Sequence, residues 1–195
     1  MNPYDIAKVM AKRRSTRAFA PAPVAENDLR DLVWAGVQAP SGCNTQNQRF
    51  RIVTNKDVLK EWGLIRRGFI AGAPAAIAVF ARRDILKPPA GEGPLWDFLN
   101  AQNCAAAIQN MALLATAKGL ANCWLSLDPG MERTRVLHGV GLDAMFSGID
   151  LRLFSAHGLL LVGYPSKVDD EGYPTGDEKH AHRPVARRDI EEYMI

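Results

Sequence analysis

Residues 96–118 read WDFLNAQNCAAAIQNMALLATAK, and this stretch decides how the rest of the chain is arranged. Its polar side chains gather mainly on one stripe, where Gln102, Gln109 and Thr116 recur every seven residues. The rest of the circumference is apolar, so we expect a helix that is buried on most sides and too apolar for the surface of a monomer. Polar residues interrupt it too often for a membrane span.

Shorter helices and strands alternate on both sides of this helix. Apolar spacing predicts helices at residues 3–12, 25–38, 56–65 and 131–138, and strands at residues 50–54, 75–80, 123–127 and 159–162. Two segments, 82–94 and 165–184, have no periodicity, and loops of this length often carry function. No internal repeat or break in composition divides the chain, so we expect a single domain over residues 1–195.

The composition is that of an ordinary globular protein, with 195 residues of which 47% are hydrophobic and 23% charged. A net charge of +3 is too small to indicate a nucleic-acid or membrane-surface protein, and it suits a small anionic ligand better. The three cysteines form no CxxC pair, which predicts a reducing compartment. Because the N-terminus has no secretory apolar region, we expect a cytoplasmic protein.

Several familiar catalytic motifs are missing from the sequence. It contains no GxGxxG, GxxxxGK[ST], GxSxG or HExxH, which excludes the usual dinucleotide fold, P-loop, hydrolase elbow and zincin site. His180 and His182 lie two apart in a charged segment, where a solvated pair is favoured over a metal site that needs a further ligand. His138 and His157 stand singly and are expected to be structural. We therefore predict no metal site.

Three segments carry groups that can recognise a ligand, although each also has a simpler explanation. Residues 13–17, RRSTR, can cradle an anion with guanidinium and hydroxyl groups, or they form the solvated basic end of the first helix. Residues 39–46, APSGCNTQ, can recognise a heterocycle through amides and hydroxyls, or they form a plain helix-to-strand turn. Arg183 can bind an anion or be a surface charge.

The order of these motifs is more specific than any one of them. The sequence has RRSTRAF at 13–19, APSGCNTQ at 39–46, GLANCWLS at 119–126, LLLVGYP at 159–165 and HRP at 182–184. In this order they resemble the nitroreductase family of FMN-dependent oxidoreductases. The resemblance implies an α+β fold of the three-layer α/β/α kind, with a mixed central sheet flanked by helices. It also implies an interlocked homodimer with FMN at the subunit interface, and no nucleic-acid partner.

The same resemblance assigns the cofactor-binding residues. The ribityl phosphate would be held by the side chains of Arg13, Ser15, Arg17 and Arg183 and by the backbone of Arg14. A loop of the partner subunit would approach the flavin with Pro40, Ser41, Gly42, Asn44 and Gln46. The backbone against the isoalloxazine ring would come from Trp124, Leu125 and Ser126. The pyrimidine edge of the flavin would be contacted by Arg67.

The chemistry implied by the family belongs mainly to the flavin. NADH or NADPH would reduce FMN, leave, and be replaced by a nitroaromatic, quinone or similar small organic acceptor in a ping-pong cycle. The protein would supply a dry shelf, a hydrogen bond near N5 and positive potential near N1, so no catalytic side chain is named. Two alternatives remain open: another flavin reaction on the same fold, such as enone reduction, reductive dehalogenation or heterocycle oxidation, and a flavin- or nucleic-acid-binding module without catalysis.

The sequence departs from the family pattern at three positions. Asn47 and Gln48 stand where the family commonly has a Pro followed by an aromatic residue or a second Pro, and Cys43 replaces a commoner Gly or Ser. The amides of Asn47 and Gln48 either line the acceptor side of the pocket or belong to a solvated turn. The physiological acceptor and the preferred nicotinamide are not decided by the sequence.

Overall fold

The computed structural model describes residues 3–65, 67–85, 94–127, 146–150 and 152–173, together with residues 191 and 194. The described elements, in chain order, are α1 (Pro3–Lys12), α2 (Glu26–Val37), η1 (Gly42–Asn44), β1 (Gln48–Val53), α3 (Lys56–Ile65), η2 (Gly68–Gly72), β2 (Ala75–Arg82), α4 (Pro94–Ala117), β3 (Ala121–Ser126) and β4 (Phe154–Gly163). The predicted order of helices and strands is confirmed, with β4 beginning earlier than expected. The helix predicted at 131–138 lies outside the described residues.

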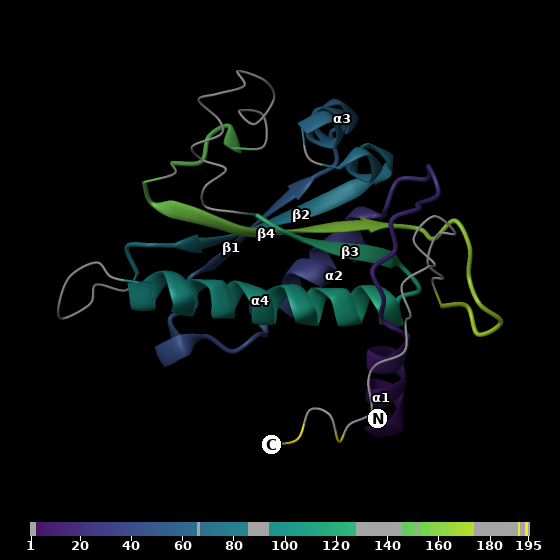
Figure 1. The fold of residues 1–195 in the computed structure, drawn as a ribbon, viewed down its shortest axis with the longest axis horizontal. Coiled ribbons are helices and arrows are strands. Elements are labelled where there is room, and N and C mark those ends of the chain that lie inside the picture. Colours follow the sequence, from purple (N-terminus) through teal and green to yellow (C-terminus); the bar gives the residue numbers. More distant parts are fainter. Residues whose placement is uncertain are drawn as a thin grey trace.

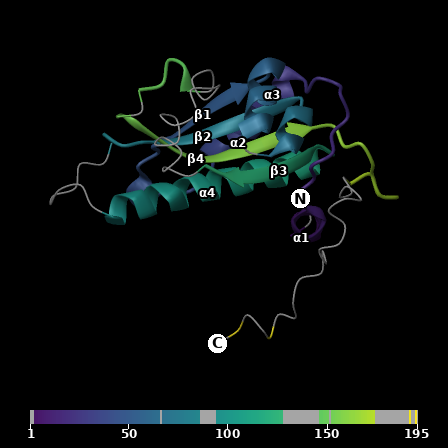
Figure 2. The same ribbon diagram turned by 45° about the horizontal axis from the view of Figure 1, so that its top comes forward.

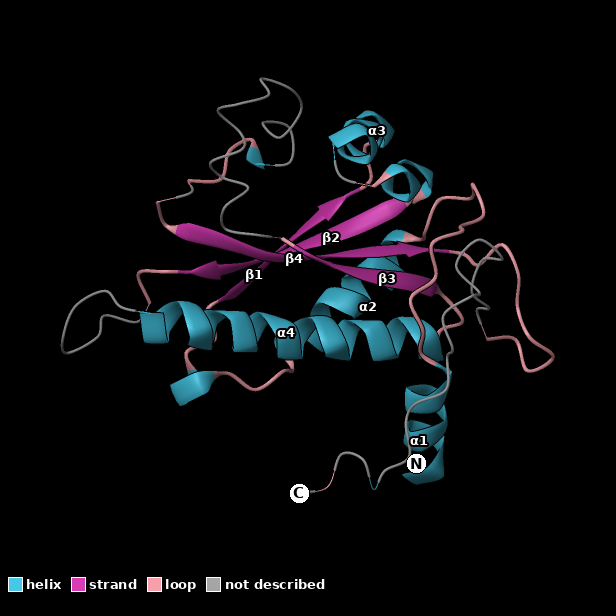
Figure 3. Cartoon of the chain, viewed as in Figure 1, coloured by secondary structure: helices cyan, strands magenta, loops and turns pink. Residues whose placement is uncertain are grey.

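The four strands form one sheet in the order β1-β2-β4-β3, and neighbouring strands run antiparallel (Figures 1 and 3). The central strands β2 and β4 are buried over most of their length, as expected for apolar runs covered on both faces. Within the described ranges, the parallel component of the expected mixed sheet is a single bridge between Ser15 and Asn122.

Helices cover both faces of the sheet, which gives the three layers predicted for the fold (Figure 2). Alternate side chains of β2 point to opposite faces. Ile77 belongs to the same core cluster as Ile108 of α4, on the face that α4 and α2 cover. Phe80 belongs to a second cluster with Trp62 of α3, on the other face. The sheet therefore lies between the two core clusters, at the centre of the described part of the chain.

The long helix α4 is buried on most sides, as its sequence predicts. Its polar stripe is divided, because Gln102 and Gln109 are exposed whereas Thr116 is only 2% exposed. Thr116 satisfies its hydroxyl by donating to the carbonyl oxygen of Ala112 at 2.9 Å. Gly119, with φ of 72°, ends the helix in the left-handed conformation that glycine adopts easily. No helix in the described part of the chain, α4 included, is both long enough and apolar enough to cross a membrane.

Candidate functional site

Residues 13–17 follow α1 and reach the edge of the sheet at Ser15. The N–H of Arg13 still donates to the carbonyl oxygen of Val9 at 2.9 Å, as in the last turn of a helix. The N–H of Thr16 donates to the carbonyl oxygen of Asn122 at 2.8 Å, next to the parallel bridge between Ser15 and Asn122. Successive side chains beside a strand point to opposite sides, so Ser15 and Arg17 are expected to share one side.

The buried thiol of Cys123 identifies the side to which these groups point. Burial raises the pKa of Cys123, while the charge of Arg17, a hydrogen bond with Ser15 and the charge of Arg13 lower it in part. The Ser15 hydroxyl therefore lies against Cys123 of β3, and the charges of both arginines act on the same thiol. Guanidinium groups in this arrangement match the oxygens of a phosphate.

Arg14 adds an unused donor to the same segment. Its Nε is buried and has no hydrogen-bond partner among the described residues. A buried N–H without a partner is unfavourable. Arg14 precedes Ser15 in the bridged part of the segment, so its side chain points away from that of Ser15, and the side-chain donors that fit a phosphate are those of Arg13, Ser15 and Arg17.

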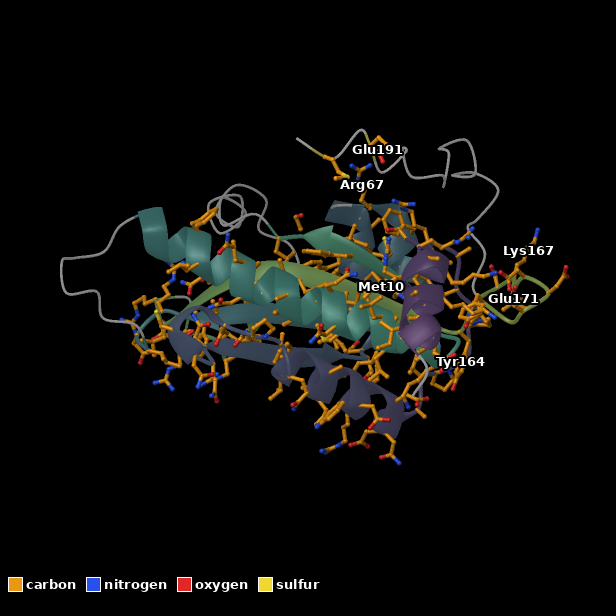
Figure 4. All side chains as sticks on the ribbon, turned by 90° about the horizontal axis from the view of Figure 1, so that it is seen from below. Met10, Arg67, Tyr164, Lys167, Glu171 and Glu191 are labelled. Carbon is orange, nitrogen blue, oxygen red and sulfur yellow. The ribbon has the colours of Figure 1, made fainter. Side chains whose placement is uncertain are left out.

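The helix that leads into this segment is fixed by ion pairs. Lys12 Nζ lies 2.8 Å from the Asp169 carboxylate, and Lys8 Nζ lies 2.9 Å from that of Glu171. Both ammonium groups also lie over the ring of Tyr173, at 5.8 Å for Lys8 and 5.3 Å for Lys12. Figure 4 shows Glu171 on the loop that follows β4, beside the end of α1. This loop therefore holds α1, and with it the start of residues 13–17, against the sheet.

Arg17 connects the anion-binding segment to η2 on the far side of the sheet from α4. Its guanidinium carbon lies 5.6 Å from the centre of the Phe69 ring. Arg67 stands two residues earlier, at the N-terminus of η2, in extended conformation and exposed. Arg67 is thus carried on a segment that contacts Arg17, and its predicted contact with the flavin stays a prediction.

The edge of β3 is open beside the same segment. β3 pairs with β4 on one side, and beyond the Ser15 bridge its other side has no strand partner among the described residues. In an antiparallel pair the backbone groups of alternate residues point away from the partner. Because the carbonyl of Asn122 points outward to Thr16, the backbone N–H and C=O groups of Trp124 and Ser126 also point to the open edge.

Trp124 forms an apolar surface next to that edge. Its side chain is 39% exposed, and it crosses Gly158 of the neighbouring strand β4. A Cβ at Gly158 would lie 3.0 Å from the indole Nε1 of Trp124 and would collide with Ile108 of α4. The glycine therefore allows the indole to lie across β4. Open backbone donors and an exposed aromatic face together can receive a planar heterocycle.

The second predicted segment, residues 40–46, folds as a tight loop between α2 and β1. The N–H of Gln46 donates to Ser41 Oγ at 2.9 Å, and its side-chain amide donates to Asn44 Oδ1 at 3.1 Å. Pro40, Asn44 and Gln46 are exposed, so their side chains are available to a ligand or a partner. The segment is fixed by Asn103, whose Oδ1 accepts the N–H of Gly42 at 2.9 Å.

The two predicted halves of the site lie at different ends of α4. The loop of residues 40–46 is attached near Asn103, whereas β3 is attached near Thr116, which accepts a hydrogen bond from Asn122 at 3.2 Å. Thirteen residues of helix, or about 20 Å, separate these attachment points. In Figure 1 the loop after α2 lies below the left half of α4, and residues 13–20 lie near its right end. One chain therefore does not bring the two halves together.

Asn47 neither lines an open pocket nor belongs to a solvated turn, so both expectations for this residue are wrong. Asn47 is fully buried, and its Nδ2 donates to Asn100 Oδ1 at 2.6 Å. Gln48 begins β1 and directs its amide to the carbonyl oxygen of Asn103 at 3.4 Å. Both residues belong to a polar contact between the loop and α4, because a helix that carries buried amides needs polar partners.

Sequence reasoning missed Asn100 and Phe69, both of which contact predicted site residues or their neighbours. Asn100 is 5% exposed in the first half of α4, where only the predicted burial of that helix could have indicated a polar partner. Phe69 gives no sequence signal of its contact with Arg17. The phosphate contact predicted for Arg183 lies outside the described residues.

The sequence matches the model of the nitroreductase family over residues 10–63 and 58–140. A protein of Archaeoglobus fulgidus, provisionally named NADH dehydrogenase/NAD(P)H nitroreductase, is 30% identical over 180 residues, which are 90% of this chain and 92% of that protein. The chain belongs to the nitroreductase family. The family expected from the motif order is thus confirmed.

Two solved structures of nitroreductases show the same fold. One, from Desulfovibrio desulfuricans, is a provisionally named nitroreductase in complex with FMN; it has a TM-score of 0.73 and 24% identity, and the alignment covers 100% of this chain and 96% of that one. The other, a nitroreductase with bound FMN from Desulfitobacterium hafniense DCB-2, has a TM-score of 0.65 and 23% identity over 95% of this chain and 100% of that one. The three-layer nitroreductase arrangement is therefore shared.

Proposed function

We propose that this nitroreductase is an FMN-dependent oxidoreductase that passes hydride equivalents from NADH or NADPH to a nitroaromatic, quinone or similar organic acceptor by a ping-pong mechanism. One observation carries the proposal: Ser15, which lies among Arg13, Arg14 and Arg17 in the sequence, pairs with Asn122 at the open edge of β3. An anion site next to unused backbone donors matches a ligand with a phosphate at one end and a flat heterocycle at the other.

The phosphate of FMN would be held by Arg13, Ser15 and Arg17, with the backbone of Arg14 and the side chain of Arg183 as further contacts. Ser15 lies against Cys123 of β3, and the charges of Arg13 and Arg17 act on the same thiol. A guanidinium group can donate two parallel hydrogen bonds to the oxygens of a phosphate. Arg67, carried on the segment that contacts Arg17, would reach the pyrimidine edge.

The flavin ring would lie along the open edge of β3. The outward backbone groups of Trp124 and Ser126 would bind the polar edge of the ring, and Leu125 follows between them. When bound, FMN supplies the two-electron chemistry that none of these side chains can provide. The described residues orient the ring and stabilise the negative charge that it gains on reduction.

A second copy of the chain would complete the site. A groove of about 410 Å³ lies between α1, α2 and α4, lined mainly by apolar residues such as Ile6, Trp34 and Leu113. Trp34 is 62% exposed and Val37, at the end of α2, is 60% exposed. Such a continuous apolar surface is typical of an interface between protein chains. We propose that the groove is covered by the second copy in a homodimer.

The same helix α2 would deliver the loop of residues 40–46 to the partner's flavin. α2 ends at Val37, so the exposed loop begins only three residues beyond the apolar surface. If the groove is an interface, Ser41, Gly42, Asn44 and Gln46 are carried to the second copy, where their amides and hydroxyl can bind the ring of its flavin. This arrangement accounts for the separation of the two halves within one chain.

Mixed dimers test this sharing. One chain carries Arg13→Ala with Arg17→Ala, and the other carries Asn44→Ala with Gln46→Ala, each with a different affinity tag. If each site uses both chains, the mixed dimer has one intact site and binds about half the FMN of the wild type. If each chain holds its own flavin, no site is intact, and FMN content stays as low as in either variant dimer.

The redox activity is tested on the same preparations. The bound flavin should lose its visible absorption when NADH or NADPH is added without air, and a nitroaromatic or quinone should restore it. A yellow protein that is not reduced by either nicotinamide would exclude this activity and favour another flavin reaction on the same fold. A protein that neither retains nor rebinds FMN would contradict the whole proposal.

A further inference from the structure

Left-handed backbone angles are concentrated in the loop between α2 and β1. Cys43, Asn44 and Gln46 have φ values of 52°, 52° and 48°, and no other residue with a side chain in the described ranges has a positive φ. This conformation is unfavourable for residues that carry a Cβ, and it persists only where the surroundings impose it. Hydrogen bonds within the loop, such as that from the N–H of Gln46 to Ser41 Oγ, and contacts from α4 together hold it.

Asn103 of α4 contacts both ends of the loop. Its Oδ1 accepts the N–H of Gly42 at 2.9 Å, before the left-handed residues. Its Nδ2 donates to Thr45 Oγ1 at 3.3 Å, between the left-handed residues Asn44 and Gln46, and to Asn47 Oδ1 at 3.1 Å, after them. Asn103 is only 4% exposed, so these contacts are shielded from water. A single amide thus fixes the distance between the two ends of the loop.

A second pair of amides holds Asn47, which is a hydrogen-bond partner of Asn103. Asn47 Nδ2 donates to Asn100 Oδ1 at 2.6 Å, and the carbonyl oxygen of Asn47 accepts the N–H of Arg82 at 2.8 Å. Asn47 is therefore held by both α4 and the end of β2. Because its polar atoms have partners, the network is rigid and buried polar groups are not left unsatisfied.

The rigidity is placed where the fold itself does not need it. The side chains of Cys43, Asn44 and Gln46 are exposed, so the strained conformation buries no apolar surface in this chain. A helix-to-strand connection could use glycine at the left-handed positions without strain. Strain that stability does not require is typical of residues that are held in shape for a ligand.

We propose that Asn103 is a positioning residue that fixes residues 41–46 in the shape that recognises the flavin ring bound to a second copy of the chain. This inference rests on the proposed function. Asn103 is buried and acts through the loop, without touching the flavin. The loop that Asn103 positions would contact the polar edge of the heterocycle. The phosphate would be bound elsewhere, by residues 13–17.

The test uses full-length, FMN-loaded protein and three variants. Asn103→Ala removes the contacts at both ends of the loop. Thr45→Val keeps the side-chain shape and removes one acceptor of Asn103, together with the 3.4 Å hydrogen bond that Thr45 Oγ1 donates to Asn47 Oδ1. Leu59→Ala is the control, because Leu59 is fully buried in α3 on the opposite face of the sheet. Thermal unfolding, the dissociation constants for FMN and riboflavin, and the visible spectrum of the bound flavin are measured for each protein.

We expect Asn103→Ala to weaken FMN and riboflavin binding by the same factor, about tenfold, and to change the visible spectrum. Thr45→Val should act in the same direction with a smaller factor. Leu59→Ala should lose at least as much thermal stability and keep wild-type affinity and spectrum. A purely structural role would instead make affinity follow stability in all three variants.

The inference is overturned if Asn103→Ala and Thr45→Val bind both flavins like the wild type, if only FMN binding weakens, or if the Leu59→Ala control changes equally. If Asn103→Ala does not fold, the Thr45→Val comparison decides. Wild-type protein that binds no flavin would instead remove the proposed function, and this inference with it.

Discussion

The two regions proposed to bind FMN are built by different means. Residues 13–17 follow α1 and pair with β3 through Ser15, where the alternation of the chain is expected to place Ser15 and Arg17 on one side. The loop of residues 41–46 holds three left-handed residues, and buried amides of α4 fix it. The first region gains its shape from regular backbone structure, and the second needs specific side chains.

This difference separates the two tasks of a nucleotide site. A phosphate is recognised mainly by charge, so an extended segment that presents several guanidinium groups is sufficient. A heterocycle is recognised by donors and acceptors at fixed positions, so the segment that reads it must be rigid. We therefore expect substitutions in the first region to alter phosphate-dependent binding and substitutions in the second to alter ring-dependent binding.

The largest expected effect comes from removing the charge of the first region. Arg13→Ala with Arg17→Ala should weaken FMN binding by at least about 3 kcal/mol, a factor of about 100 in Kd, because each lost hydrogen bond to a charged partner contributes about 1.5 to 3 kcal/mol. Riboflavin, which has no phosphate, should lose much less. Isothermal titration with both flavins measures this. Equal losses for the two flavins would place the arginines away from the phosphate.

A second, smaller effect should follow from separating the two copies. Trp34→Glu places a charge in the apolar groove between α1, α2 and α4, and should weaken self-association by about 2 to 4 kcal/mol. Sedimentation equilibrium measures the dimer constant, and FMN retention should fall with it. Leu64→Glu is the control, because Leu64 is 87% exposed on α3 and outside the groove. A monomer that keeps FMN would show that one chain suffices.

The parts of this structure that follow local periodicity could be predicted from the sequence. Helices α2 and α4 and the apolar strands β2 and β4 follow from the spacing of apolar residues and from Pro and Gly at their ends. The first region could be predicted as an anion site because its chemistry is visible in five consecutive letters, RRSTR, and this role stays a prediction.

The second region could be assigned only in part, for a physical reason. Its residues were named correctly as a loop, but its shape depends on Asn47, Asn100 and Asn103, which are distant in sequence and meet only when α4 packs against β1 and β2. From the sequence alone, Asn47 is therefore expected to lie in a solvated turn or in the acceptor pocket. The extra residue His157, which forms a bulge in β4, likewise depends on pairing with β2.

A change at Cys43 tests the strain of the second region. Cys43→Gly should stabilise the protein by about 0.5 to 1 kcal/mol. Glycine removes the left-handed penalty of about 1 to 2 kcal/mol, but part of this gain is offset because glycine loses more backbone entropy on folding. Asn44→Gly is the matched control with the same φ of 52°, and its gain should be close to zero because asparagine tolerates this conformation. Chemical denaturation measures both. Equal gains would mean that Cys43 is not strained.

The smallest effect concerns pH, where the two regions should respond differently. The hydrogen bond from Lys12 holds the pKa of Asp169 below its ordinary value of 3.8, and that of Glu171 is held below 4.5 by Lys8. A lowered carboxyl pKa stabilises the fold above the unfolded value, and this contribution is lost as the pH falls through the folded value. The pKa of Lys12, the partner, is raised above 10.5. The stability that the Lys12 ammonium contributes is therefore lost only at alkaline pH. The tether of α1 should therefore weaken below about pH 4.

The stability difference between wild type and Asp169→Asn should be constant from about pH 6 to 8 and should shrink towards pH 3, as measured by thermal unfolding. The corresponding difference for Asn103→Ala should not depend on pH over this range, because the amides that it contacts do not titrate. Since the Asp169 pair is partly exposed, its effect is small and should decrease further in salt. A pH-independent difference for Asp169→Asn would show that backbone contacts, and not this ion pair, hold α1 beside residues 13–17.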